Sequence, residues 1–210
     1  MKNVLQLKTS LFSDAGTSSR LADEFVEAWR KAHPEATVTV RDLAREPVPH
    51  LDAERFQAFI ARPEERTERQ RALAECSDLL IEELRRADVI VIGLPMYNFG
   101  IPSTLKAYFD YIARAGITFK YTEQGAVGLL SGKKAYIFAT GGGHHAGTEH
   151  DGRTTQVRAF LGLLGIETEF IYAEGLDLGP ESRANSLAAA RSAIARLVAG
   201  VNPDQQAVAV

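Results

Sequence analysis

Three loops hold the residues whose types and spacing could do chemistry, and the first is residues 9–19. It contains Ser10, Gly16, Thr17 and Ser18, and it leads into a helical pattern. Backbone N–H groups and the dipole at a helix start favour an anion, and hydroxyls add donors without adding charge, which suits a monophosphate. The loop lacks the Gly-x-Gly-x-x-Gly and Walker patterns, which disfavours dinucleotide and ATP sites of those kinds. A serine cap beside a polar turn would give the same pattern.

The second loop follows a run of four β-branched residues, Val89 to Ile92, which is typical of a strand buried on both faces. It is unusually aromatic for a loop at a strand end. Flat ligands bind such surfaces, because rings pack together while amides meet polar ring edges. A hydrophobic plug closing the sheet is the alternative. The residues that could contact a ring are Pro95, Met96, Tyr97, Asn98 and Phe99.

The third loop begins at Thr140 and continues through Gly141, Gly142 and Gly143. Consecutive glycines let the backbone approach a ligand closely and present N–H groups. His144 follows directly and could donate a proton to a substrate, although a surface or supporting role is the alternative. No carboxylate or cysteine at helical spacing completes a metal set, so we expect no metal site.

Short apolar runs alternate with segments of helical period, which predicts an α/β fold with a doubly wound parallel sheet. In such a sheet, ligands bind beyond the carboxyl ends of the strands, so the three loops should meet. We expect a single domain over residues 1–200 and a flexible tail over 201–210, and we leave residues 47–66 unassigned. The expected strands are 4–7, 38–40, 89–92, 135–139 and 169–172, and the expected helices cover about 21–29, 67–87, 102–112, 155–164 and 181–199.

Composition excludes several classes of protein. The net charge is −3 and no basic run appears, so nucleic acid is not an expected partner. No apolar stretch reaches the roughly 20 residues that span a bilayer, and no signal-peptide pattern is present, so we expect no membrane association. The single cysteine, Cys76, rules out an intrachain disulfide and favours the cytoplasm.

The sequence resembles the FMN-dependent NAD(P)H azoreductases of bacteria, which are relatives of flavodoxin and of the flavodoxin-like quinone reductases. The resemblance covers roughly residues 2–199, and the segments that carry it are 95–99, 105–110, 114–122 and 173–175. It implies a flavodoxin-like five-stranded sheet in the order 2-1-3-4-5. It also implies bound FMN, NADH or NADPH as electron donor, and a homodimer in which each flavin pocket is closed by the partner subunit.

The resemblance also assigns roles to the loops. Ser10 and residues 16–18 would hold the FMN phosphate, residues 96–99 would line the isoalloxazine, and residues 140–143 would reach its pyrimidine end. Two departures are Gly16, where we expect a serine, and Gly141, where some relatives carry a larger side chain, often arginine. The expected substrate pocket consists of Phe56, Phe59, Phe119 and Tyr121, and Tyr121 and His144 are the candidate proton donors.

The implied reaction is a ping-pong transfer of two electrons, as a hydride, from the nicotinamide through FMN to azo compounds and quinones. A quinone reductase with incidental azo activity would use the same residues. A flavodoxin-like carrier of single electrons is less consistent with the sequence, because carriers usually show a strongly acidic face. A flavin-binding module without enzymatic activity is the remaining alternative.

Overall fold

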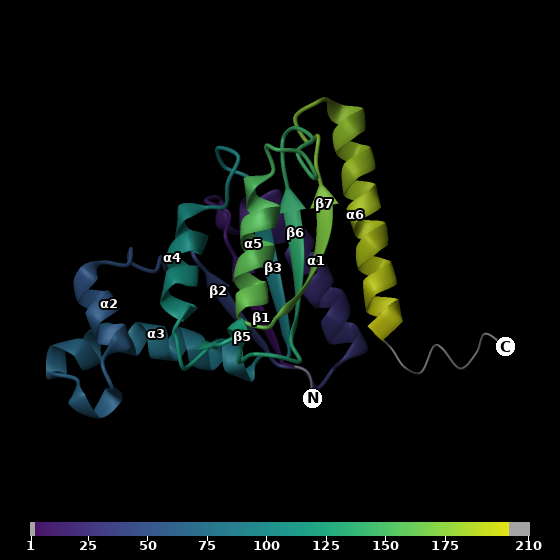
Figure 1. Ribbon diagram of the computed structural model, residues 1–210. Coiled ribbons are helices and arrows are strands. Elements are labelled where there is room, and N and C mark those ends of the chain that lie inside the picture. The colour runs from purple at the N-terminus through teal and green to yellow at the C-terminus, as the bar shows by residue number, and fades with distance from the viewer. Residues whose placement is uncertain (1–2, 202–210) are drawn as a thin grey trace.

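The computed structural model describes residues 3–201, and a five-stranded parallel sheet forms its centre (Figure 1). Its strands occur in the spatial order β2-β1-β3-β6-β7. Pairing is in register from Val4 opposite Val38 and Val89 at one end to Thr140 opposite Ala173 at the other. The sheet strands are β1 (Val4–Lys8), β2 (Val38–Asp42), β3 (Val89–Pro95), β6 (Lys134–Thr140) and β7 (Glu167–Ala173).

Helices cover both faces of the sheet, as the alternating pattern predicts. They are α1 (Thr17–Ala32), α2 (Ala53–Ile60), α3 (Glu68–Arg86), α4 (Ser103–Ile112), α5 (Gly152–Leu163) and α6 (Pro180–Val201), with short 3₁₀ turns η1 (Ser13–Ala15) and η2 (Pro63–Glu65). α1 and α6 pack on one face, and α3, α4 and α5 cover the other (Figure 1). This arrangement confirms the flavodoxin-like α/β fold. The expected tail lies outside the described residues beyond Val201.

Alternate residues of the central strands supply two separate cores, because successive side chains of a strand point to opposite faces. Val89 and Val91 of β3 join Phe25 and Trp29 of α1 in one core. The intervening Ile90, with Ile92 and Leu94, joins the core formed with α3, α4 and α5. Burial on both faces explains why β3 reads as an uninterrupted apolar run.

The sequence analysis missed a hairpin formed by β4 (Phe119–Thr122) and β5 (Gly125–Gly128). These strands pair antiparallel outside the main sheet. Along the chain, the two hairpin strands come between the third and fourth strands of the main sheet. The observed order therefore carries the labels 2-1-3-6-7 instead of the expected 2-1-3-4-5. The unassigned residues 47–66 contain α2, which begins where the Asp52 side chain accepts a hydrogen bond from the Arg55 N–H.

The carboxyl ends of all five sheet strands point to the upper edge in Figure 1, where the loops after β1, β3 and β6 come together. Among residues 3–201, no helix has the length and apolar character needed to cross a membrane.

Candidate functional site

A cavity of about 240 Å³ lies at this carboxyl edge, between the loops after β1, β3 and β6. Most of the predicted cofactor residues line it, namely Ser10, Gly16, Thr17, Ser18, Pro95, Met96, Tyr97, Thr140, Gly141 and Gly142. Asn98, Phe99 and Gly143 are not among its lining residues. Four lining residues were not anticipated: Phe12, Leu176, Asp177 and Arg183.

The tyrosine of the second loop joins it to the first. Tyr97 Oη lies 3.3 Å from Ser10 Oγ and accepts a hydrogen bond of 3.1 Å from the Leu11 N–H. Ser10 Oγ in turn accepts a hydrogen bond from the Phe12 N–H at 3.2 Å. One phenol therefore fixes the relative position of two loops that line the cavity.

The first turn of α1 has hydrogen-bonding capacity that the protein does not use. Its N-cap is Gly16, which supplies no side-chain cap. The hydroxyls of Ser18 and Ser19 are buried and have no hydrogen-bond partner within the described structure. A buried polar atom without a partner costs free energy, so these donors favour an oxyanion at this helix start.

A steric constraint explains why residue 16 is a glycine. A Cβ at this position would lie 2.2 Å from Ser10 Oγ and 2.5 Å from Ser10 Cβ. The backbone angle φ of −68° is ordinary, so space rather than conformation requires glycine here. The departure from the expected serine thus leaves room for the Ser10 side chain in the lining of the cavity.

The second loop ends in a two-residue turn. Tyr97 and Gly100 exchange backbone hydrogen bonds of 3.2 and 3.0 Å, and Asn98 and Phe99 between them have φ of 49° and 63°. Positive φ at both central positions defines a type I′ turn, in which a phenylalanine is strained. The exposed Phe99 ring extends to His145, with 5.6 Å between ring centroids.

The backbone carbonyl groups of the three glycines in the third loop all accept hydrogen bonds from the segment that follows β7. The carbonyls of Gly141, Gly142 and Gly143 accept hydrogen bonds of 3.2, 3.0 and 3.0 Å from the N–H groups of residues 176, 177 and 175. Within residues 3–201, the N–H groups of Gly142 and Gly143 have no acceptor. The loop therefore presents free donors beside the cavity, as a polar ring edge would require.

A cluster of buried charged side chains forms hydrogen bonds with the backbone of the third loop. Arg153 of α5 is fully buried and donates to the Thr140 carbonyl at 2.6 Å and to the Glu174 carboxylate. The other Glu174 oxygen accepts the N–H groups of His145 and Ala146, each at 2.9 Å. We call Arg153, Glu174 and Asp151, which accepts from Arg153 Nε at 3.3 Å, the loop clamp.

The carboxyl group of Asp151 has a depressed pKa. Burial alone would raise this pKa, but hydrogen bonds from the Thr154 hydroxyl and N–H and the charge of Arg153 together lower it. Asp151 also accepts the Thr154 N–H at 3.2 Å and so caps α5. The Asp151 carboxylate is therefore ionised at neutral pH. Its partner Arg153, which also donates to the Thr140 carbonyl, ties α5 to the third loop.

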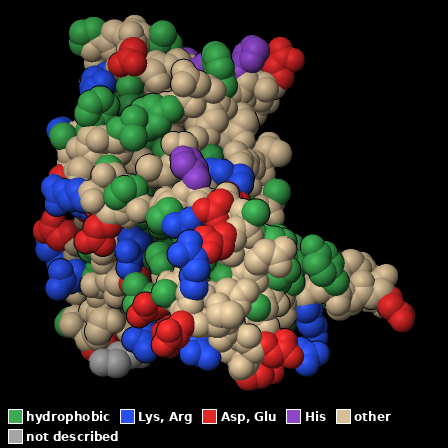
Figure 2. Space-filling model, turned by 90° about the vertical axis from the view of Figure 1, so that its left-hand side faces the viewer, with side chains coloured by type: hydrophobic (Ala, Val, Ile, Leu, Met, Phe, Trp, Pro, Cys, Tyr) green, Lys and Arg blue, Asp and Glu red, His purple; other side chains and the backbone are tan. Residues whose placement is uncertain are grey.

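The four predicted substrate-pocket residues come together in a separate groove of about 510 Å³ between α2, α4 and the hairpin. Its lining includes Phe56, Phe59, Phe119 and Tyr121, and it shares no lining residue with the cavity at the carboxyl edge. We call it the aromatic groove. Figure 2 shows the side of the molecule carrying α2 and α4, where hydrophobic side chains are prominent in the upper part and charged ones in the lower part.

The two candidate proton donors do not meet within one chain. Tyr121 lies in the aromatic groove with a 76% exposed side chain. His144 lines a different, polar cavity together with Tyr172, Glu174 and Ser182. Neither residue lines the cavity at the carboxyl edge. Their role as proton donors stays a prediction.

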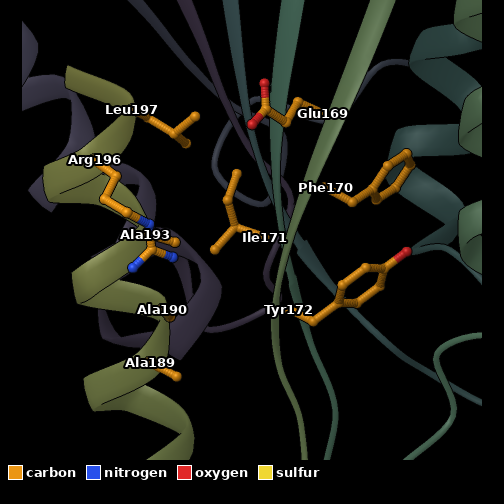
Figure 3. Close-up of a pocket in the computed structure, with 9 residues that line it drawn as sticks. All are labelled: Glu169, Phe170, Ile171, Tyr172, Ala189, Ala190, Ala193, Arg196 and Leu197. Atoms are coloured by element: carbon orange, nitrogen blue, oxygen red, sulfur yellow. The ribbon is translucent and has the colours of Figure 1, made fainter. Parts of the chain in front are cut away.

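A further groove lies between β7 and α6, away from the three loops. Figure 3 shows Ile171 directed at Ala190 and Ala193 of α6, while Phe170 and Tyr172 project from the opposite side of β7. The groove has largely aliphatic walls and offers no cluster of chemically active groups. Within residues 3–201, no group of three or more histidine, cysteine, aspartate or glutamate side chains could hold a metal ion.

Comparison with known proteins agrees with the fold. A family model described as a flavodoxin-like fold matches residues 2–198, and the chain belongs to this family. It is 54% identical over 185 residues to the FMN-dependent NADH:quinone oxidoreductase of Cellvibrio japonicus, covering 88% of this chain and 93% of that protein. It is 49% identical over 191 residues to the enzyme of the same name from Alcanivorax borkumensis, covering 90% and 96%.

Solved structures of azoreductases share the fold of this chain. An azoreductase from Bacillus anthracis str. Sterne superposes with a TM-score of 0.86 at 27% identity, covering 94% of this chain and 99% of that one. An FMN-dependent NADH-azoreductase from Bacillus anthracis str. Ames Ancestor, solved in complex with FMN, superposes with a TM-score of 0.83 at 26% identity, covering 94% and 100%.

Proposed function

We propose that this protein is an FMN-dependent NADH:quinone and azo oxidoreductase that works by a ping-pong two-electron transfer. The observation that carries the proposal is the cavity at the carboxyl edge. It combines the uncapped start of α1, the buried hydroxyl of Ser18, an apolar wall and the free N–H group of Gly142. Relatives at about 50% identity named FMN-dependent NADH:quinone oxidoreductase support the quinone activity, and the similar FMN-dependent NADH-azoreductase structure supports the azo activity.

The residues present fit FMN at each end of the cavity. The N–H groups of the first turn of α1 and the hydroxyls of Ser10, Thr17 and Ser18 suit the phosphate. Pro95, Met96 and Tyr97 suit the faces and edge of a flat ring. FMN, when bound, supplies the hydride chemistry between the nicotinamide and the acceptor.

The chain contributes binding and orientation. Tyr97 fixes the first loop against the second, so the phosphate and ring ends keep a constant separation. The loop clamp orients the N–H groups of Gly142 and Gly143, which would stabilise negative charge at a ring edge. His144 or Tyr121 would supply the proton that the reduced acceptor takes up.

We also propose that the protein acts as a homodimer in the cytoplasm. The aromatic groove contains Phe56, Ile60 and Tyr121, whose side chains are 51%, 60% and 76% exposed. Exposed apolar side chains gathered around one groove are typical of a contact surface. Because the groove is separate from the chain's own flavin cavity, we propose that it serves as the roof over the partner's cavity.

The decisive experiment is to purify the protein, record its absorbance and follow NADH oxidation with benzoquinone and with methyl red. We expect a yellow protein that reduces both acceptors, with parallel lines in double-reciprocal plots. The ratio of kcat/KM for the two acceptors assigns the preferred substrate class. A colourless protein that FMN cannot reconstitute would refute the proposal. A flavoprotein that forms a stable semiquinone without oxidising NADH would indicate an electron carrier instead.

A further inference from the structure

The aromatic groove has two walls that come from different parts of the chain. One wall is α2, which contributes Phe56 and Phe59, and the other is the hairpin, which contributes Phe119 and Tyr121. α2 projects from the body of the molecule and packs mainly against α3 (Figure 1). The width of the groove therefore depends on the contacts that fix α2 relative to the hairpin.

Arg114, which lies between α4 and the hairpin, holds the first wall through its side chain. It is 4% exposed and lines the groove. Its Nη2 donates to the Phe59 carbonyl at 3.4 Å, and its guanidinium carbon lies 5.4 Å from the centre of the Phe59 ring. Phe59 is in the last turn of α2, which has no basic side chain of its own there. Because a cation at a helix C-terminus is favourable, Arg114 caps α2 from another element.

The backbone of the same residue holds the second wall. The Arg114 N–H donates to Thr118 Oγ1 at 3.0 Å, and the Arg114 carbonyl accepts the Thr118 N–H at 2.9 Å. Thr118 directly precedes Phe119 of the hairpin. Its carbonyl accepts the N–H of Leu129, which directly follows the second hairpin strand, at 2.9 Å. Both walls of the groove are thus bonded to one residue.

A cluster of polar and charged side chains fixes the guanidinium group itself. Arg114 Nη1 donates to Ser77 Oγ at 3.1 Å and to the Asp78 carboxylate, both on α3. Arg66, which is 7% exposed, donates to the other Asp78 oxygen at 3.4 Å. Two buried cations therefore share one carboxylate, and the Nε of each has no hydrogen-bond partner within residues 3–201. Burying such a cluster costs desolvation free energy, so it contributes little net stability, which favours a role in fixing geometry.

We propose that Arg114 is a positioning residue that sets the width of the aromatic groove and thereby selects electron acceptors by size. The inference rests on the proposed function, in which this groove is the roof over the partner's flavin cavity. An acceptor with two rings, such as methyl red, needs both walls at the correct separation, whereas the single ring of benzoquinone can pack against one wall. Arg114 acts through Phe59 and Phe119 and not on the reacting atoms.

The test measures NADH-dependent reduction of methyl red and of benzoquinone by the full-length, FMN-loaded protein. Arg114→Met keeps a long side chain but removes its charge and its donors. We expect it to raise KM for methyl red about tenfold, the scale of a lost charged hydrogen bond, and KM for benzoquinone less than about threefold. The kcat with benzoquinone and the Kd for FMN should not change, because the groove shares no lining residue with the flavin cavity.

Two further variants separate positioning from stability. Arg114→Lys keeps the charge but lacks the fork that reaches both α2 and α3, so it should recover thermal stability without recovering KM for methyl red. Arg41→Ala is the matched control, because Arg41 is also largely buried and pairs with an α3 carboxylate, that of Glu83 at 2.5 Å. It belongs to β2 and does not line the groove. We expect this control to unfold at a lower temperature and to keep both KM values.

Amide hydrogen exchange reports how firmly α2 is held, without any acceptor present. Arg114→Met should speed exchange in residues 53–60, and Arg41→Ala should not. If Arg114→Met does not fold, the ratio of the two KM values and the exchange in α2 are measured on Arg114→Lys instead, since it keeps the charge.

The outcomes distinguish this inference from the proposed function. An active Arg114 variant that keeps the wild-type ratio of the two KM values, or wild-type exchange in α2, would overturn the inference and leave the proposed function standing. Equal rises in both KM values would show general damage and would also overturn the inference. A wild-type protein that reduces neither acceptor would refute the proposed function and the acceptor selectivity together.

Discussion

The Tyr97 hydroxyl lies 3.3 Å from Ser10 Oγ and 3.1 Å from the Leu11 nitrogen, and through these contacts it joins the loops after β1 and β3. Residues 10 and 97 come from strands that are neighbours in the sheet, so parallel pairing brings them to the same edge. The contact makes the conformation of the first loop dependent on an aromatic residue of the second loop.

Tyr97→Phe should weaken FMN binding about five- to tenfold, because a net hydrogen bond contributes roughly 1 kcal/mol. The fold should be unaffected, since the ring remains. Fluorescence titration of the stripped protein measures the change. The matched control is Tyr172→Phe, whose hydroxyl contacts Thr154 Oγ1 at 3.1 Å and lies outside the flavin cavity. Equal FMN affinities for the two variants would contradict the role of Tyr97.

Gly16→Ala should weaken FMN binding more strongly, because its Cβ would collide with the Ser10 side chain. The reason is steric, so removing that side chain should relieve it. We expect the double variant Ser10→Gly/Gly16→Ala to bind FMN no more weakly than Ser10→Gly alone. If the two substitutions are simply additive, a collision between residues 10 and 16 is not the cause.

Glu174→Ala should destabilise the protein by about 3–5 kcal/mol, because it leaves Arg153 buried with only part of its charge compensated. Urea unfolding measures this loss. Glu174→Gln keeps an acceptor for the N–H groups of His145 and Ala146 and should cost less. The two variants should also differ in FMN affinity. Indistinguishable variants would mean that the clamp does not orient the third loop.

Asp151 gives stability a dependence on pH. Its pKa in the folded protein is below the ordinary value of 3.8, so its contribution is complete above that value and disappears as the pH falls through the lower, folded-state pKa. Asp151→Asn should therefore be less stable than the wild type at pH 6, and the difference should shrink as the pH falls below 3.8. Urea midpoints at several pH values test this. A difference that stays constant with pH would assign the effect to the helix cap alone.

Ile60→Asp should convert the proposed dimer into monomers, because it places a charge in the exposed part of the aromatic groove. Light scattering after size exclusion measures the mass. Leu79→Asp is a suitable control, since Leu79 is similarly exposed, at 55% against 60%, and does not line the groove. We expect the Ile60 variant to bind FMN but to reduce quinones poorly. A monomeric wild-type protein would rule out the partner roof.

The sequence was most informative where a single local pattern determines whether a segment forms a strand or a loop. The apolar run of residues 89–92 predicted the buried strand β3, and Gly141 and Gly142 of the third loop line the cavity at its carboxyl edge. The hairpin β4–β5 was missed because its residues after Phe119 are exposed and its partner strand has a glycine at each end, which obscures the alternation typical of strands.

Other residues could not be found from local patterns because tertiary pairing places them. Asp177 and Arg183 reach the cavity only because residues 175–177 hydrogen-bond to the three glycines of the third loop. Arg153 is buried by partners at positions 140 and 174, neither of which is close in sequence. A lone arginine in a helical segment gives no sign of such burial.

The uncapped start of α1 has a consequence for the protein in a living cell. Its unsatisfied donors make the flavin-free chain less stable than the loaded one. A ligand that binds only the folded state raises the free energy of unfolding by RT ln(1 + [L]/Kd). A concentration of FMN one hundred times the Kd would add about 2.7 kcal/mol. Proteases remove unfolded chains, so the abundance of this protein should follow the supply of riboflavin.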